Sequence, residues 1–511
     1  MHIAYNLRSG HLYASVVTSV RENGKVRKKL GRYLGRVLDA ERGIYQSKER
    51  GVFFSYDLKA DTISSAPENF VPNIRRKNAR EELLVDFGDT HVFSEFLRKI
   101  GLDGVIRSIP YGNLDPIFGL LHYYMQAKES NAHAECWFEG NYARILYPNA
   151  NLSSQRISDM LHAVGREDSL RAFFKAYLEW LGTSVTRDAN ILIDSTGVPN
   201  SIRFPITAVS NHNGQISEEV RLIYVVQQGT RMPIYMRYVP GNVIDTTTLA
   251  TTIKELKAMG VNTKFAILDA GYVTAECIEQ LFEEKISFIT RCPTNRKVYK
   301  DLITKELDGL EEAGNLAVDK EGRLFNGRQV YIKCVPVEYE GHHLYAYVCR
   351  DKGMQEVERK KFLDKNANGR INAKKFHDEM REHGVFVLLA TRRIQPEHVL
   401  SHYYVRQDIE QVFDITKNYT SLLPLNVEKE ETFREHLLMP FIATALLQQI
   451  QNEVKNSNFS LDRILMRMRT QKAKFFENVV IPGEPVKEHR QIYKLLGVKC
   501  AKEYVRKAPT A

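Results

Sequence analysis

Residues 189–197 read Ala-Asn-Ile-Leu-Ile-Asp-Ser-Thr-Gly, and this stretch decides the fold. A short apolar run that ends in a polar Asp-Ser-Thr-Gly segment is typical of a buried strand followed by a turn. Asp194 stands at the end of the predicted strand. A carboxylate in that position lies at the rim of a sheet, where ligands usually bind, although an Asp after a strand is also a common turn former.

A second strand of the same kind ends at Asp269. Residues 265–268 are Phe-Ala-Ile-Leu, and Asp269-Ala270-Gly271-Tyr272 follows them. The surrounding pattern predicts strands at 220–226 and 234–239, a helix at 246–259, a helix at 275–285 and a strand at 287–290. Three strands followed by helix, strand, helix and strand is the order of an RNase H-like mixed sheet with helical cover. We therefore expect a mixed α/β fold with an RNase H-like core.

A third chemical feature lies on a helix that we predict at about 396–417. Tyr403, Arg406, Glu410 and Lys417 stand at offsets 0, 3, 7 and 14. At about 100° per residue these positions fall within roughly a 60° arc of one helix face. The plain alternative is an amphipathic helix in which Arg406 and Glu410 form an i,i+4 ion pair.

The spacing Tyr-x2-Arg-x3-Glu-x6-Lys is the signature of a superfamily of bacterial insertion-sequence transposases of the DDE type, named after these four residues (YREK). This sequence resembles that superfamily at all four positions, over about residues 150–450. Other segments that look like the family occur in the family's order: Asp194-Ser195-Thr196, Pro240-Gly241-Asn242, Leu268-Asp269-Ala270-Gly271-Tyr272 and Arg434-Glu435-His436.

The resemblance implies a catalytic and metal-binding trio of Asp194, Asp269 and Glu410. Three carboxylates suit two Mg²⁺ ions, which prefer oxygen ligands, with Mn²⁺ as a substitute. Such a site would cleave DNA by phosphodiester hydrolysis and join the freed 3′-hydroxyl ends to target DNA. Arg406 and Lys417 would clamp a DNA phosphate, and the Tyr403 hydroxyl would add a hydrogen bond.

The charge of the chain is uneven, which points to a polyanionic partner. The net charge is +10, but residues 1–80 carry 16 Lys and Arg against 7 Asp and Glu, and residues 452–511 carry 13 against 6. We expect double-stranded DNA, as terminal inverted repeats and target, to be the partner, although solvated basic surfaces are the plain alternative. The predicted DNA-contacting arm follows an Asn23-Gly24 turn and carries Lys25, Arg27, Lys28, Lys29 and Arg32. The resemblance further implies a homodimer in a synaptic complex.

We predict seven regions from the changes in pattern along the chain. They are a basic N-terminal β-hairpin region (1–61), a linker (62–80), a helical DNA-binding region (81–185), the RNase H-like core in two parts (186–293 and 385–450), a β-rich insertion domain (294–384) and a basic C-terminal helical region (451–511). No apolar span of about 18 residues and no signal peptide is present, so we expect a cytoplasmic protein. The resemblance further implies a bacterial protein associated with the nucleoid.

Two other functions remain open from the sequence. One is a metal-dependent nuclease of the same fold that cuts DNA without joining it. The other is a domesticated, non-catalytic DNA-binding protein. In some relatives a tryptophan of the insertion domain stacks on a flipped base. Here both tryptophans, Trp137 and Trp180, precede Asp194. Either Tyr299, Phe325 or Tyr331 takes that role, or the step is absent.

Overall fold

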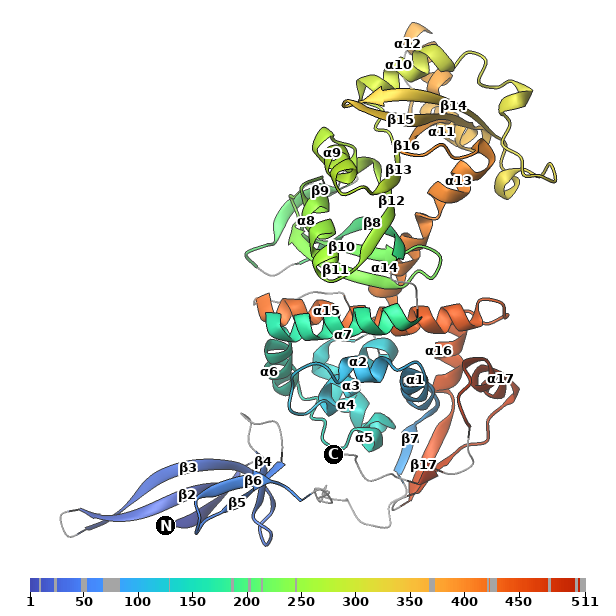
Figure 1. Cartoon of the computed structure of the whole chain (residues 1–511). Helices are drawn as coiled ribbons and strands as arrows, with labels where there is room; N and C mark the ends of the chain where they lie inside the picture. The colour runs from blue at the N-terminus through green and yellow to red at the C-terminus, as the bar shows by residue number, and fades with distance from the viewer. Residues whose placement is uncertain are drawn as a thin grey trace. The chain divides into compact units, whose positions relative to one another are not determined.

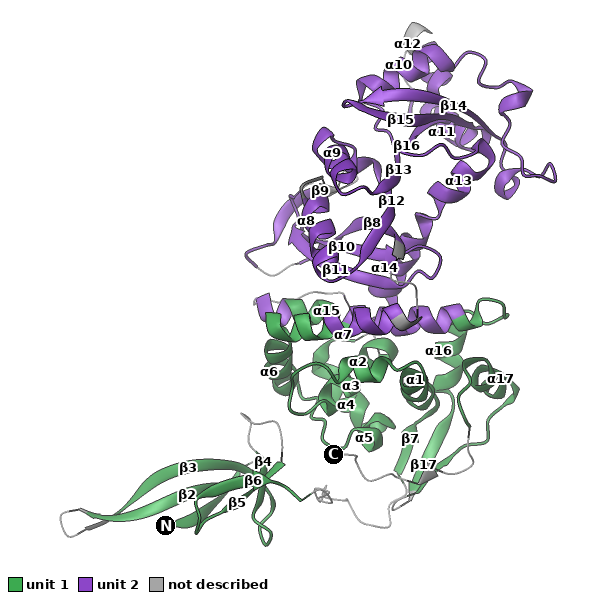
Figure 2. Cartoon of the chain, viewed as in Figure 1, with its two compact units in different colours: residues 1–173, 434–439, 453–511 green, residues 174–433, 440–452 purple. Residues whose placement is uncertain are grey.

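The structure, a computed structural model, describes most of the chain. The described residues are 1–8, 11–22, 25–46, 53–67, 83–127, 129–184, 188–200, 204–212, 215–243, 246–366, 373–420, 422, 430–476, 479–500 and 504–505. They form two compact units (Figure 2): residues 1–173, 434–439 and 453–511 make unit 1, and residues 174–433 and 440–452 make unit 2. The helices α7 (Glu167–Ser184) and α15 (Glu430–Val454) contribute to both.

Unit 2 is built on one large mixed sheet. In the described part of the chain its strand order is β11-β10-β8-β12-β13-β16-β15-β14, with β9 paired to β10 (Figure 1). The strands are β8 (Asp188–Pro199), β9 (Ala208–His212), β10 (Gln215–Gln227), β11 (Pro233–Pro240), β12 (Asn262–Leu268), β13 (Ser287–Arg291), β14 (Val330–Tyr339), β15 (His342–Asp351) and β16 (Val385–Ala390). β8, β12 and β13 run parallel to one another, and the other pairings are antiparallel.

The first five predicted strands have the RNase H-like order. β8, β10 and β11 form an antiparallel meander, and β12 and β13 extend the sheet in parallel on the other side of β8. The central strands are continuous apolar runs, as expected of strands covered on both faces. Ile191, Leu192 and Ile193 of β8 are buried, and so is all of β16. The mixed α/β fold class predicted from the sequence is confirmed.

The segment 294–384 was predicted to form an insertion domain rich in β-structure. Its strands β14 and β15 pair with each other, and β15 also pairs with β16 over residues 385–390. The segment therefore extends the main sheet rather than building a separate one in the described residues. Local patterns could not reveal this, because strand pairing depends on contacts between distant parts of the chain.

Helices cover the sheet of unit 2. They are α8 (Thr246–Ala258), α9 (Ala275–Glu283), α10 (Lys297–Glu306), α11 (Lys352–Asn366), α12 (Ala373–Glu382), α13 (Pro396–Tyr404) and α14 (Gln407–Tyr419), with single 3₁₀ turns at Ala270–Tyr272 (η2), Ala313–Asn315 (η3) and Phe325–Gly327 (η4). The Phe413 ring of α14 stacks on Tyr224 of β10, with centroids 5.6 Å apart. This contact seats α14 on the sheet beside β8.

Unit 1 begins with a sheet larger than the predicted hairpin. Its order is β1-β2-β3-β4-β5-β6, with β1 (His2–Arg8), β2 (His11–Glu22), β3 (Lys25–Asp39), β4 (Ile44–Gln46), β5 (Phe53–Asp57) and β6 (Thr62–Ser65). Its core contains Ala14, Leu34, Tyr45 and Phe54. Because β6 pairs with β5, the first residues of the predicted linker belong to this sheet. Asn23, Gly24 and residues 68–82 lie outside the described residues.

The rest of unit 1 is mainly helical. It contains α1 (Gly88–Lys99), α2 (Leu102–Ile106), α3 (Asp115–Gln126), η1 (Asn131–His133), α4 (Ala134–Gly140), α5 (Ala143–Leu146), α6 (Ser154–Val164), α16 (Leu461–Arg469) and α17 (Lys487–Leu496). A small sheet brings together strands that are far apart in the sequence. Its strands are β7 (Leu83–Asp86), β17 (Lys472–Phe476), β18 (Val479–Pro482) and β19 (Tyr504–Val505). None of the helices in the described part of the chain is long and apolar enough to cross a membrane.

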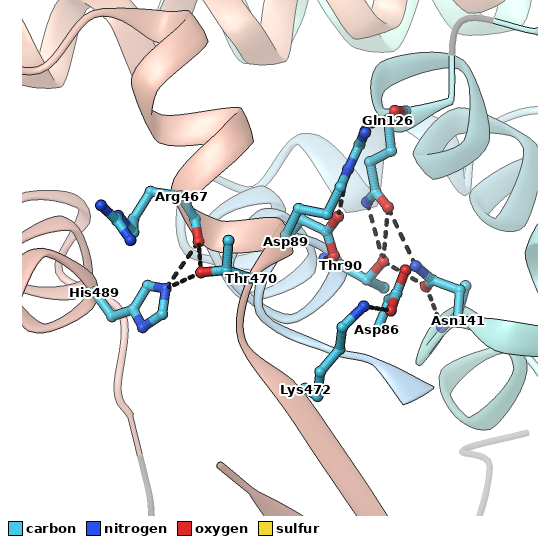
Figure 3. A network of polar contacts seen from close by, with 11 residues as sticks. Asp86, Asp89, Thr90, Gln126, Asn141, Arg467, Thr470, Lys472 and His489 are labelled. Carbon is cyan, nitrogen blue, oxygen red and sulfur yellow. Dashed lines mark hydrogen bonds and ion pairs between the residues drawn. The ribbon is translucent and has the colours of Figure 1, made fainter. Parts of the chain in front are cut away.

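A polar network lies at the start of α1 (Figure 3). The Thr90 hydroxyl donates to Asn141 Oδ1 at 2.6 Å and accepts from the Gln126 amide at 3.0 Å. The buried Asp89 carboxylate accepts the Thr90 backbone N–H at 2.8 Å and lies 3.8 Å from Arg469 Nε. Burial raises the pKa of Asp89 to about 6, against the opposing effects of the Thr90 N–H and Arg469.

Candidate active site

Asp194 lies in β8, at the point where the parallel pairing with β12 stops. The last parallel pair joins Ile193 to Leu268, whereas antiparallel pairing with β10 continues to Pro199. The prediction that the strand ends at Asp194 was therefore wrong, because β10 keeps the following residues in strand form. Relative to β12, however, Asp194 is the first residue beyond the shared edge. Its side chain is 13% exposed, and one oxygen accepts the Ser195 N–H at 2.9 Å.

Asp269 directly follows β12, as predicted. It caps the 3₁₀ turn η2, and its Oδ1 accepts the Ala270 N–H at 2.7 Å. Its backbone carbonyl accepts a hydrogen bond from the Thr290 hydroxyl of β13 at 3.1 Å. β8 and β12 are parallel neighbours in matched register. Asp194 and Asp269 therefore lie side by side at the same edge of the sheet.

The predicted single helix at 396–417 is two helices, α13 and α14. The N–H groups of Arg406, Asp408 and Ile409 donate to carbonyls three residues earlier, at 3.0, 2.8 and 3.1 Å. Such bonds tighten the chain to about 120° per residue, so the α-helical spacing is lost there. Tyr403 therefore lies in the last turn of α13, and Glu410 lies in the first turn of α14. The prediction of one continuous helix face was wrong at this turn.

The Arg406 guanidinium connects all three predicted catalytic carboxylates. Its Nη1 contacts Asp269 Oδ1, and its Nη2 lies 3.9 Å from Asp194 Oδ2 and 3.5 Å from Glu410 Oε1. Burial acts to lower the pKa of Arg406, but Asp269 and Asp194 outweigh it and raise that pKa further above its usual value. The three acids, from two neighbouring strands and a covering helix, thus converge on one cation.

The carboxylate oxygens suit a divalent metal ion, but in the described part of the chain they are not arranged around one position for it. Carboxylate oxygens are the ligands that Mg²⁺ and Mn²⁺ prefer. Among the described residues, no three His, Cys, Asp or Glu side chains are close enough together to hold an ion. The side chain of Glu410 is 58% exposed, and the guanidinium lies between it and the two aspartates. These carboxylates fit a metal ion if the Arg406 side chain moves away from its position between them.

The other two residues of the predicted phosphate clamp have protein partners. Tyr403 is buried, and burial raises the pKa of its hydroxyl while Arg406 beside it opposes the rise. Lys417 Nζ donates to Thr196 Oγ1 at 2.6 Å and to the Gly197 carbonyl at 3.1 Å. Burial lowers the pKa of Lys417, against the opposing charge of Glu219. Lys417 therefore contacts the strand that carries Asp194.

One further contact, not predicted from the sequence, holds the start of α14. Arg231 Nε lies 2.8 Å from Asp408 Oδ1, and Arg231 occupies the turn after β10 with a φ of 58°. Arg406 and Glu410 lie two residues to either side of Asp408. The pair therefore links the turn that bears two site residues to the sheet. Nothing in the local sequence pairs residues so far apart.

Comparison with protein families places this site in a known class. Residues 188–446 match the family model described as the transposase DDE domain, which is more than half of the chain. The chain belongs to the transposase DDE-domain family. Transposases of this type generally depend on divalent metal ions. The match covers β8, β12, α14 and the carboxylates that they carry.

Two further comparisons add no close relative of this transposase. No curated protein matches the sequence. Among solved structures, the chain is similar to one described as a cryo-EM structure of the piggyBac transposase synaptic complex with hairpin DNA, with 11% identity and a TM-score of 0.40. The similar region covers 74% of this chain and 76% of that chain.

The predicted DNA-contacting arm of this transposase lies in β3, which belongs to unit 1. Arg27, Lys28, Lys29 and Arg32 are exposed, and the side chain of Lys25 lies outside the described residues. Arg32 is 3.7 Å from Asp61. Of the aromatic residues considered for base stacking, Tyr299 is buried, Tyr331 is partly buried, and Phe325 stacks on Tyr404 with centroids 5.8 Å apart.

Proposed function

We propose that this transposase binds the terminal inverted repeats of an insertion sequence, cleaves the DNA and joins its 3′-hydroxyl ends to target DNA. The observation that carries the proposal is the convergence of Asp194, Asp269 and Glu410 on the Arg406 guanidinium. A cluster of three acids from two neighbouring strands and a covering helix is unfavourable unless a cation lies among them. In a transposase the working cation is a divalent metal.

In this proposal Asp194, Asp269 and Glu410 hold two Mg²⁺ ions, or Mn²⁺ in their place. The bound ions would supply activation of the attacking oxygen and stabilisation of the leaving oxygen. The three side chains orient the scissile phosphate between the edge of β8 and β12 and the first turn of α14. Because the same groups serve water in cleavage and a 3′-hydroxyl in joining, one site suffices for both steps.

Arg406 changes partner during this cycle in our proposal. Its five N–H donors match carboxylate and phosphate oxygens equally well. When the carboxylates take up metal, the guanidinium would turn to a DNA phosphate, with the adjacent Tyr403 hydroxyl as a second donor. The phosphate contact predicted for Lys417 competes with its contacts to Thr196 and Gly197.

The DNA duplex would bind to the basic ends of the chain. Lys25, Arg27, Lys28, Lys29 and Arg32 of β3 would contact phosphates, in a chain whose two ends carry the positive charge. A homodimer would bring two transposon ends into one synaptic complex. The site described above is contained within unit 2, so the second copy would contribute DNA rather than catalytic carboxylates.

A strand-transfer assay tests the proposal. A pre-cut duplex that ends in the inverted repeat found beside the gene is incubated with plasmid and Mg²⁺ or Mn²⁺, and joined product is measured. D194N, D269N and E410Q should each lower joining by a factor of about 10³ or more, as removal of a catalytic group does. D301N, which removes an exposed carboxylate of α10, should match the parent protein.

Two results would replace this function with another. Cleavage without joined product in either metal would favour a nuclease of the same fold. Unchanged activity in E410Q, together with intact DNA binding, would favour a non-catalytic DNA-binding protein.

A further inference from the structure

Glu219 of β10 is a buried carboxylate beside the candidate site. Its side chain is 4% exposed. Oε2 accepts a hydrogen bond from the Ser217 hydroxyl at 3.2 Å, whereas Oε1 is buried without a hydrogen-bond partner among the described residues. A buried carboxylate with so few donors is costly unless a positive charge compensates it. The sequence gives no hint of this role, because Glu219 follows Glu218 in a polar stretch before the strand predicted at 220–226.

Two glycines make room for Glu219. A Cβ atom at Gly197 would lie 2.6 Å from the Glu219 carboxyl carbon and 2.8 Å from its Oε1. A Cβ atom at Gly241 would overlap the Glu219 carbonyl oxygen and lie 2.8 Å from the Ala208 carbonyl oxygen. Gly197 of the Asp-Ser-Thr-Gly segment therefore gives space to the Glu219 carboxylate, and Gly241 of the Pro-Gly-Asn segment gives space to the Glu219 backbone.

Lys417 is a cation close to Glu219. Its ammonium group donates to Thr196 Oγ1 and to the carbonyl of Gly197, the residue against which the Glu219 carboxylate packs. The negative charge of Glu219 acts to raise the pKa of Lys417, against the effect of burial. A half-buried ammonium close to a buried carboxylate stabilises both charges, and each would lose if the other were removed.

The position of this contact links two metal-ligand candidates. Lys417 is seven residues after Glu410, two turns along α14, and Thr196 is two residues after Asp194 along β8. Fixing Lys417 on the strand therefore fixes how the helix that bears Glu410 lies along the strand that bears Asp194. We propose that Glu219 is a positioning residue, which holds Lys417 on β8 and so sets the spacing of Asp194 and Glu410 for metal binding. The role in metal binding rests on the proposed function.

Metal titration distinguishes positioning from a simple effect of charge. Mn²⁺ binding to the full chain is measured by isothermal titration calorimetry for the parent protein, E219Q, K417M and E219Q/K417M, with E218Q as the matched control on the same strand. Positioning predicts that E219Q and K417M each lower Mn²⁺ affinity about tenfold, as loss of a supporting contact does at metal sites. The sign for K417M is decisive, because removal of a nearby cation would otherwise tighten Mn²⁺ binding.

DNA binding separates positioning from a phosphate clamp. With Ca²⁺ present, the affinity for a fluorescent 40-base-pair duplex should be the same for K417M and the parent protein within twofold. The proposal is overturned if K417M binds Mn²⁺ more tightly, if E219Q behaves as E218Q does, or if K417M weakens DNA binding while Mn²⁺ affinity is unchanged. The last result would make Lys417 a phosphate ligand.

A stability cycle tests the Glu219–Lys417 contact without metal. E219Q and K417M should each destabilise unit 2 in urea, and the double variant should lose less than the two single variants together, because no unpaired charge remains. Additive losses would overturn the pairing. If D194N does not reduce Mn²⁺ binding, the metal site of the proposed function fails instead, and the cycle still decides whether Glu219 holds Lys417.

Discussion

Arg406 is the residue whose role the structure changes most. Its spacing with Tyr403 and Glu410 predicted a donor to DNA phosphate, and its side chain instead lies among three carboxylates. The guanidinium carries one positive charge, which offsets part of the negative charge of these acids when no metal is bound. It is 23% exposed, so it can leave without a rearrangement of the core. A residue that first balances the carboxylates and then binds phosphate would couple metal uptake to DNA binding.

Replacement of Arg406 should therefore strengthen metal binding and weaken DNA processing. In R406Q no guanidinium competes with a metal ion for the carboxylates. We therefore expect the affinity for Mn²⁺ without DNA to rise about tenfold, or roughly 1.4 kcal/mol. Isothermal titration calorimetry measures the change, and K300Q, which removes an exposed cation of α10, is the control. Equal or weaker Mn²⁺ binding in R406Q would show that the guanidinium does not compete with metal.

Gly241 offers a test of close packing at the same site. A Cβ atom there would meet the backbone carbonyl oxygens of Glu219 and Ala208, which cannot move as a side-chain end can. We expect G241A to destabilise the protein by about 2 kcal/mol, as overpacking does. Urea denaturation gives the value. Gly314 has open space around its Cα, so G314A in the same unit should stay within about 0.5 kcal/mol of the parent protein.

At the residue scale, the sequence predicts which side chains gather but not all their partners. Asp194 and Asp269 could be predicted because each follows a buried apolar run, and Glu410 because of its spacing from Arg406. The structure brings all three to one guanidinium. Glu219 and Arg231 could not be predicted, since their partners Lys417 and Asp408 lie in a helix nearly two hundred residues later, and no local pattern records that contact.

At the element scale, the order of strands was predictable and the extent of the sheet was not. Apolar runs and intervening helices indicated β8, β10, β11, β12 and β13 in sequence, but not the short β9. The pairing of β15 with β16 and the tight turn between α13 and α14 depend on tertiary contacts. The tight turn matters for chemistry, because it places Arg406 at the start of α14 rather than along a continuous helix.

Part of β2 and β3 forms a two-stranded ribbon, and its expected partner is DNA. β1 pairs with β2 only as far as Val17, and β4 pairs with β3 only from Arg36. The paired residues between, from Thr18 and Lys29 to Glu22 and Lys25, have no third strand beside them among the described residues. An isolated two-stranded ribbon gains little stability in water, so its cations are better explained by a partner than by folding.

The salt dependence of DNA binding should report these cations. Each phosphate contact contributes a slope of about −0.9 to the plot of log affinity against log salt concentration. If Lys28 and Lys29 each contact a phosphate, K28A/K29A should make the slope less negative by about 1.8. Fluorescence anisotropy with a duplex at several salt concentrations measures it. K59A, outside the ribbon, should leave the slope unchanged, and an unchanged slope in the double variant would remove both lysines from the interface.

At the scale of the whole molecule, charge and chemistry belong to different units. The basic segments 1–80 and 452–511 fall almost wholly within unit 1, whereas Asp194, Asp269 and Glu410 all lie in unit 2. DNA affinity and metal chemistry should therefore respond mainly to different substitutions, with Arg406 as the residue that serves both. The stability of unit 1 also depends on pairing between strands that are far apart in the sequence, because β7 pairs with β17.

Asp89 should make the stability of unit 1 depend on pH. Its folded pKa of about 6 lies above the ordinary aspartate pKa of 3.8, because burial opposes its ionisation. The carboxyl therefore favours the folded state fully below pH 3.8, and this contribution is lost as the pH rises to 6. D89N keeps an acceptor for the Thr90 N–H but cannot ionise. Its stability relative to the parent protein should therefore be greater at pH 7.5 than at pH 4.5 by about 2 kcal/mol, from 1.36 kcal/mol per pKa unit.

Urea denaturation of both proteins at the two pH values measures this difference, with D103N as a control, since Asp103 pairs with Arg107 at the surface of α2. A difference that is constant with pH would mean that the ion pair between Asp89 and Arg469 outweighs burial. In that case the network in Figure 3 would stabilise unit 1 through charge, and D89N would lower stability at both pH values. The two outcomes distinguish two roles of Asp89. In the first, it is a buried carboxyl that destabilises unit 1 when it ionises; in the second, it is a carboxylate that joins α1 to Arg469 at the end of α16 as an ion pair.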